Sequence, residues 1–128
     1  NVGSTGAAAL AAFLRSPGCA LQTLDAYRAA LGGDGVKVIL AAAAESLQIR
    51  SLNLTANAHH EVSWLSSVGN FVADAVSRAV SLKVLRLSCP EAEIKNAQQV
   101  FSASTVTVIL IPNEQNNYNR SMFMGHVH

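Results

Sequence analysis

The segment from Ile49 to Asn57 constrains the fold more than any other part of the chain, because its leucines are spaced as in a half-buried strand. Leu52 and Leu54 lie two residues apart, so in an extended backbone both side chains point to the same side, into a core. Asn57 falls where the chain leaves the strand, and its side chain can bond backbone groups that the sheet leaves unpaired. The positions predicted to point away from the core are Ser51, Asn53 and Thr55.

The same spacing recurs along the chain, as expected for a repeat architecture. Leu21-Gln-Thr-Leu24-Asp-Ala26 begins 28 residues before Ile49, and Leu82-Lys-Val-Leu85-Arg-Leu87 begins 33 residues after it. A fourth, less regular copy runs from Val106 to Asn113. We therefore predict four strands at equivalent positions of successive units.

Between these strands, apolar residues recur at the spacing of a helix. We predict a first helix from Ser4 or Thr5 to Arg15, and a second helix that Asp34 caps. A third helix follows Gly69, and a short fourth one lies around residues 94–101. The apolar face of the second helix is predicted to consist of Val36, Ile39, Leu40, Ala43 and Leu47.

Six extra residues lie between Asn57 and Gly69, compared with the interval from Ala29 to Gly35. Insertions at one edge of a repeat array often form functional loops. The single tryptophan, Trp64, lies in this segment and is a candidate contact residue. The alternative, which the helical spacing of the neighbouring apolar residues favours, is a longer third helix with the tryptophan packed on the core.

Alternating strands and helices at this period resemble the leucine-rich repeats of the ribonuclease-inhibitor type, which also occur in NOD-like receptors and in the activating proteins of the GTPase Ran. The resemblance covers residues 3–113 and implies an α/β solenoid, with about four parallel strands on the concave side and helices on the convex side. Residues 1–113 would form a partial repeat array, and residues 114–128 a polar C-terminal tail or cap. Because no cap precedes the first unit, we expect the chain to be a piece of a longer protein or assembly.

Composition and charge argue against several kinds of partner. Half of the residues are apolar, which favours a packed core, and the net charge of +1 is too balanced to favour nucleic acid or an anionic membrane. No apolar run reaches the roughly 18 residues of a membrane span. Cys19 and Cys89 belong to units two strands apart, too distant for a disulfide, so we predict free thiols and a cytoplasmic location.

Catalytic and metal-binding motifs are not apparent. The sequence holds neither a nucleophile elbow nor a phosphate-binding glycine loop, so we predict no enzyme activity, no catalytic residue and no cofactor. His59, His60 and Glu61 are adjacent, whereas zinc-binding helices place two ligands four residues apart, so we predict no metal site there.

The candidate binding surface is the outward side of the strands, which a stack of parallel strands presents to a partner. Val84, Ile109 and Ile111 would form an apolar patch on it, which we expect the C-terminal tail or another protein to cover. Ser88 is predicted to point outward on the same strand as Val84, and Lys83 adds positive charge nearby. Read across the four strands, the central positions are Asp25, Asn53, Arg86 and Ile109. The residues predicted to contact a protein are Asp25, Tyr27, Arg28, Arg50, Asn53, Arg86, Ile109 and Ile111, with Trp64 as a loop contact.

These observations predict a non-enzymatic protein-interaction module or scaffold. One alternative is a structural or accessory subunit segment of a large assembly, which would explain a small array without caps. Another is a regulator of a small GTPase, as the Ran-activating relatives are. The leucine-rich-repeat fold does not decide among them, because one fold carries many functions.

Overall fold

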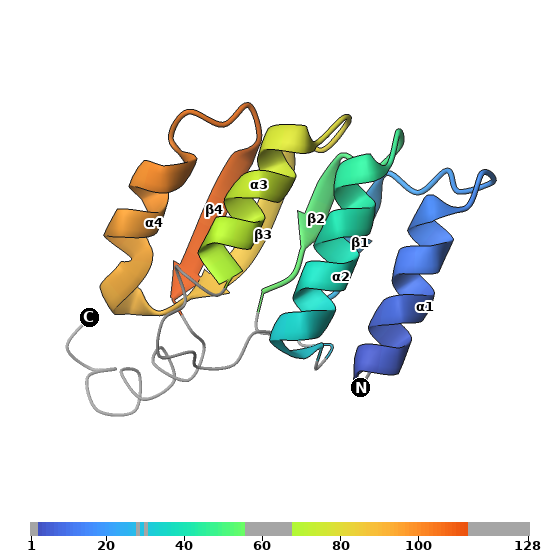
Figure 1. Cartoon of the computed structure of the whole chain (residues 1–128), viewed down its shortest axis with the longest axis horizontal. Coiled ribbons are helices and arrows are strands. Elements are labelled where there is room, and N and C mark those ends of the chain that lie inside the picture. The colour runs from blue at the N-terminus through green and yellow to red at the C-terminus, as the bar shows by residue number, and fades with distance from the viewer. Residues whose placement is uncertain (1–2, 28, 30, 56–67, 113–128) are drawn as a thin grey trace, which may run out of the picture.

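Helices and strands alternate along the chain in the computed structural model, which describes residues 3–27, 29, 31–55 and 68–112. Each of the first three strands is followed by a helix that returns the chain to the start of the next strand (Figure 1). The elements are α1 (Gly3–Arg15), β1 (Thr23–Asp25), α2 (Gly32–Glu45), β2 (Ser51–Asn53), α3 (Asn70–Arg78), β3 (Val84–Cys89), the 3₁₀ helix η2 (Glu91–Glu93), α4 (Ile94–Phe101) and β4 (Thr107–Pro112).

The four strands form one parallel sheet in the order β1-β2-β3-β4, so each strand lies beside its neighbours in the sequence. The leucine spacing predicted the alignment of these strands correctly. Leu24 is the Cα partner of Leu52, Leu52 of Leu85, and Leu85 of Val108. The predicted α/β class with four parallel strands is therefore confirmed.

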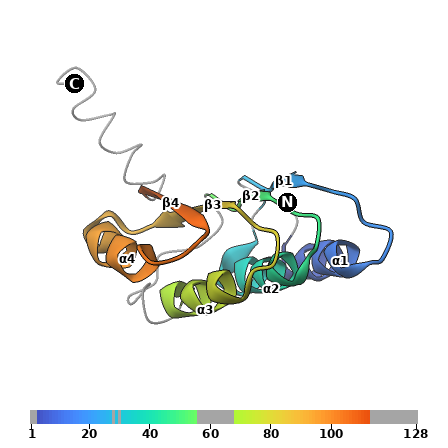
Figure 2. The same ribbon diagram turned by 90° about the horizontal axis from the view of Figure 1, so that it is seen from above.

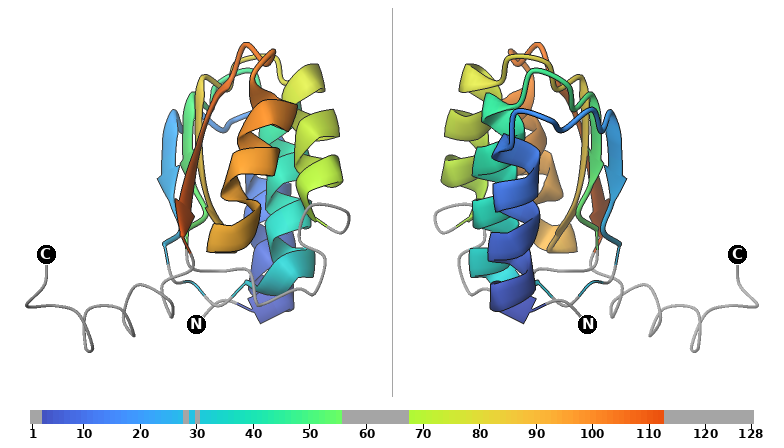
Figure 3. Two further views of the ribbon diagram at one scale, coloured as in Figure 1. Left: turned by 90° about the vertical axis from the view of Figure 1, so that its left-hand side faces the viewer. Right: turned by 90° about the vertical axis from the view of Figure 1, so that its right-hand side faces the viewer.

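The helices form a second layer that covers one face of the sheet (Figures 2 and 3). The core lies between the two layers. Ile49, Leu52 and Leu54 are all completely buried there, with at most 1% of their surface exposed. Leu85 and Leu87 repeat the arrangement on β3, because alternate side chains of a strand point to the same face. Full burial of one such leucine stabilises the fold by about 1.5–3 kcal/mol.

Small residues let α1 and α2 approach closely. Ala7 and Ala11 of α1 are buried, as are the alanines at positions 42–44 of α2. Gly35 leaves little room for a side chain, because a Cβ atom there would lie 3.0 Å from Leu31 Cβ and 3.2 Å from Ala7 Cβ, closer than most Cβ contacts. The first and second helices are thus held together by small-residue packing.

Two predictions about α2 were wrong. The helix begins at Gly32 after the N-cap residue Leu31, so Asp34 lies within its first turn and is not its cap. Gly32 has a φ of +73°, which favours glycine at this start. Leu47 is 72% exposed and does not pack on the core. Its exposure follows from the end of the helix at Glu45, after which the chain turns out of the helical path.

The segment 56–67 and the tail 113–128 lie outside the described residues, and with them the predictions made for Asn57, for Trp64 and for a C-terminal cap. In the part that is described, no helix is both long enough and apolar enough to cross a membrane.

Candidate functional site

The face of the sheet opposite the helices, here called the open face, carries the predicted binding residues that belong to the strands. Asp25 is the Cα partner of Asn53, Asn53 of Arg86, and Arg86 of Ile109. The central row predicted from the sequence therefore exists. With neighbouring strands about 4.8 Å apart, it crosses roughly 14 Å of the sheet.

The open face changes character from one edge to the other. On β1, Thr23 and Asp25 are exposed, and Tyr27, just after the strand, is 46% exposed. Arg86 on β3 is exposed. The apolar residues are nearer the other edge, where Val84, Ile109 and Ile111 are all half-buried. The face is therefore polar along β1 and apolar along β4.

Two residues predicted to point outward are buried. Thr55 is only 7% exposed because the chain turns after the end of β2, where the backbone N–H and the hydroxyl of Thr55 both donate to Asn53 Oδ1, at 3.0 and 2.6 Å. Ser88 is 3% exposed and lies between the buried Leu87 and Cys89 on β3, beside its partner Ile111 on β4. On β2 and β3 the exposed surface therefore ends before these two positions.

Asp25 and Asn53 have a structural role that their position on the open face did not reveal. Asp25 Oδ1 accepts the backbone N–H of Tyr27 at 3.1 Å, the same interaction that Asn53 makes with Thr55. Such side-chain turns satisfy backbone groups where a strand ends. The available sequence signal was the occurrence of Asp and Asn at the same position of two successive units. Both residues hold their strand ends and also border the open face.

Arg50 and Lys83 lie side by side at the start of β2 and β3. The carbonyl oxygen of Arg50 accepts the N–H groups of Lys83, at 2.8 Å, and of Val84, at 3.0 Å. Both basic side chains are exposed, and Arg86 lies three residues beyond Lys83. We call Arg50, Lys83 and Arg86 the basic cluster. Arg28, the other predicted basic contact, lies outside the described residues.

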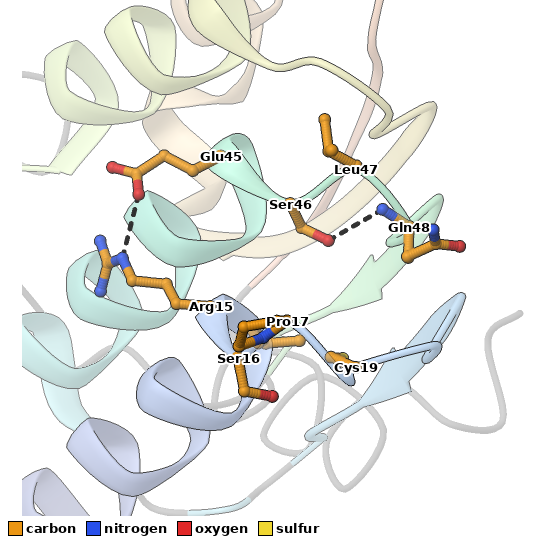
Figure 4. A pocket seen from close by; sticks show the side chains of 9 residues that line it. Arg15, Ser16, Pro17, Cys19, Glu45, Ser46, Leu47 and Gln48 are labelled. Carbon is orange, nitrogen blue, oxygen red and sulfur yellow. Dashed lines mark hydrogen bonds and ion pairs between the residues drawn. The ribbon is translucent and has the colours of Figure 1, made fainter.

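A cavity of about 420 Å³ lies away from the open face, beside the carboxyl ends of α1 and α2 (Figure 4). At its mouth Arg15 Nε donates to Glu45 Oε1 at 3.0 Å. This hydrogen bond and the charge of Arg15 hold the pKa of Glu45 below its usual value, which makes the carboxylate a weaker base. None of the predicted contact residues lines this cavity.

The two cysteines are free, as predicted, and both are buried. Burial raises the pKa of the Cys89 thiol to about 12, and the nearby charge of Glu93 adds to the effect. Thiolate is the reactive form of cysteine, so this thiol is unreactive in the folded protein.

Metal-binding side chains do not gather in the described ranges, where no three of His, Cys, Asp and Glu lie close enough to hold an ion. His59, His60 and Glu61 are outside those ranges. No protein-family model matches the chain, and no curated protein sequence matches it either.

Proposed function

We propose that the chain is a leucine-rich-repeat array that works as a non-enzymatic protein-binding module, with the open face as its docking surface. The observation that carries this proposal is the arrangement of the sheet. All helices described cover one face of the sheet (Figure 3), while the other face is formed by four strands with aligned residues. The unit length and leucine spacing support the leucine-rich-repeat assignment, because aligned aliphatic rows buried once per strand are what such an array requires.

The composition of the open face suits a protein partner. Val84, Ile109 and Ile111 provide aliphatic surface at one end, and binding energy at protein interfaces is concentrated in a few well-packed groups. Arg86 lies next to this surface as the Cα partner of Ile109. Arginine is favoured in interfaces because its guanidinium group donates several hydrogen bonds in a fixed geometry.

The sheet supplies a rigid base for docking. The strands are held in a continuous parallel ladder, and the ends of β1 and β2 are fixed by Asp25 and Asn53. A partner that binds a pre-formed surface loses less conformational entropy than one that must order a loop. In this proposal the module needs no cofactor and functions in a reducing, cytoplasmic environment.

Site-specific photo-crosslinking tests the proposal. A benzoylphenylalanine placed at Thr107, an exposed open-face position, should crosslink a protein partner in cells that express the chain. The same residue placed at Val38, which is 40% exposed on α2, is the matched control and should not crosslink that partner. Crosslinking from Val38 alone, or from neither position, would show that the open face is not the docking surface.

A further inference from the structure

We infer that the partner of the open face supplies an acidic, extended protein segment that binds the basic cluster of Arg50, Lys83 and Arg86. The inference rests on the proposed function, because it names the chemistry of the partner at the same surface. It is carried by three exposed cations of the neighbouring β2 and β3 segments, none of which forms an ion pair with a described carboxylate.

The basic residues are brought together by the parallel ladder. Arg50 and Lys83 directly precede the adjacent strands β2 and β3 at the same level, since the carbonyl oxygen of Arg50 accepts the N–H of Lys83 at 2.8 Å. Their backbones are therefore about 4.8 Å apart. Like charges at opposite positions of neighbouring strands repel each other and destabilise the sheet. An anion placed over the pair would remove this repulsion.

Three of the four cations on the described helices have a partner, Lys95 on α4 being the exception. Arg15 and Arg78 each lie 3.0 Å from a carboxylate, that of Glu45 and of Asp74 respectively. The ammonium group of Lys37 lies 5.9 Å from the centre of the Phe71 ring. The described part of the chain thus provides partners for three helix-side cations and none for the basic cluster.

The acidic residue of the open face does not compensate the basic cluster. Asp25 is separated from Arg86 by β2, because Asn53 lies between them in the row. Its carboxylate also accepts the N–H of Tyr27. The open face therefore keeps a positive region that a negatively charged partner complements.

Apolar residues beside the basic cluster favour a protein segment over nucleic acid. Val84 follows Lys83 directly, and Ile109 is the Cα partner of Arg86. An extended peptide places every second side chain on the same side, so one side of it can carry both carboxylates for the cations and aliphatic groups for Val84 and Ile109. A phosphate backbone would leave these apolar groups without a suitable contact, and nucleic-acid affinity depends on many phosphate contacts.

A peptide-binding measurement tests the inference. The probe is a fluorescent peptide of about eight residues, Glu-Ser-Val-Ser-Glu-Ser-Val-Ser, which carries Glu and Val on the same side and is long enough to cross the sheet at about 3.3 Å per residue. Its comparison is the peptide with Gln in place of each Glu. We expect the acidic peptide to bind the whole chain more tightly, with an affinity that falls between about 50 and 200 mM salt.

Two lysine variants carry the matched control. Lys83→Gln should raise the Kd for the acidic peptide about threefold or more, since exposed ion pairs contribute modestly. Lys95→Gln removes the same charge from an exposed position on α4 and should leave the Kd nearly unchanged. Equal effects of the two variants, equal binding of the Gln peptide, or tighter binding of a short oligothymidine would each overturn the inference.

The crosslinking experiment separates this inference from the proposed function. If Thr107 captures a partner whose crosslinked peptide is not acidic, the inference about charge is wrong while the docking surface stands. If Thr107 captures no partner, the proposed function has failed, and the inference has failed with it.

Discussion

Asp25 and Asn53 are Cα partners on adjacent strands, and a side-chain oxygen of each accepts the N–H of the residue two positions later. The sheet therefore uses one device twice to fix where its strands end. On β2 the device also sets the extent of the open face, because Thr55 is turned inward by its bonds to Asn53.

Asn53→Ala should lower the free energy of unfolding by about 1–2 kcal/mol, because two hydrogen bonds from Thr55 are lost at the end of β2. Asn53→Asp keeps a side-chain oxygen in place and should change stability by less than about 0.5 kcal/mol. Urea denaturation followed by circular dichroism measures both. Equal midpoints for the two variants would show that the side-chain oxygen does not hold this turn.

Leu52→Ala should cost about 2–5 kcal/mol, because it leaves a cavity where a completely buried side chain packs between the sheet and the helices. Ser51→Ala is the neighbouring control on the opposite face of β2. It should stay within about 0.5 kcal/mol of the unmodified protein. The same urea titration distinguishes the two, and a similar loss in both variants would contradict the burial pattern of this strand.

Gly35→Ala should destabilise the protein by about 1 kcal/mol, although alanine favours helix. The new methyl group would lie 3.0 and 3.2 Å from the Cβ atoms of Leu31 and Ala7, which cannot move without their backbone. Gly33→Ala meets no atom within 4 Å and should be neutral or stabilising. Melting temperatures give the comparison. A stabilised Gly35→Ala protein would mean that α1 and α2 can separate at little cost.

Arg86→Glu should reduce crosslinking of the partner through Thr107, because it reverses a charge in the middle of the open face. Its melting temperature should correspond to a change within about 0.5 kcal/mol, as expected for an exposed side chain. Arg86→Lys keeps the charge and should retain most of the crosslinking. Undiminished capture by Arg86→Glu would remove the central row from the binding surface.

The pKa of Cys89 predicts a loss of stability at high pH. Burial raises this pKa from an ordinary value of 9.0 to about 12, so the unfolded chain releases the thiol proton at lower pH than the folded protein does. The contribution is complete below pH 9 and is lost as the pH rises towards 12. The urea midpoint should therefore fall more between pH 8 and pH 10 for the unmodified protein than for Cys89→Ala. Identical falls would show that this thiol does not contribute.

Leucine spacing was enough to predict the strand alignment and the central row of the open face. Both follow from the alternation of side chains along a strand, which places Leu52 inside and Asn53 outside together. The same alternation predicted that Thr55 and Ser88 point to the open face, and this prediction was wrong because both are buried. Alternation describes a regular strand, and it does not describe the turn after Asn53 or the burial of small polar groups at the end of β3.

The errors in α2 have a similar origin. Periodicity predicted its buried residues Val36, Ile39, Leu40 and Ala43, since these depend on side-chain spacing. The helix ends depend on backbone angles, such as the positive φ of Gly32 and the extended ψ of 139° at Ser46. Because of these angles, α2 begins before Asp34 and ends before Leu47, which is exposed to solvent.

Because the strands follow one another across the sheet in chain order, strand–helix units can be added or removed without changing the order of the remaining strands. Duplicating one complete strand–helix unit would insert a new strand between two existing ones, and each original strand would still have a parallel neighbour. Thr107 donates its N–H towards β3, to the carbonyl oxygen of Lys83 at 2.8 Å, so the alternate residues Val108 and Leu110 direct their backbone groups to the outer edge. A grafted unit would find hydrogen-bonding positions there already in register, which makes this chain a starting point for building binding surfaces of chosen width.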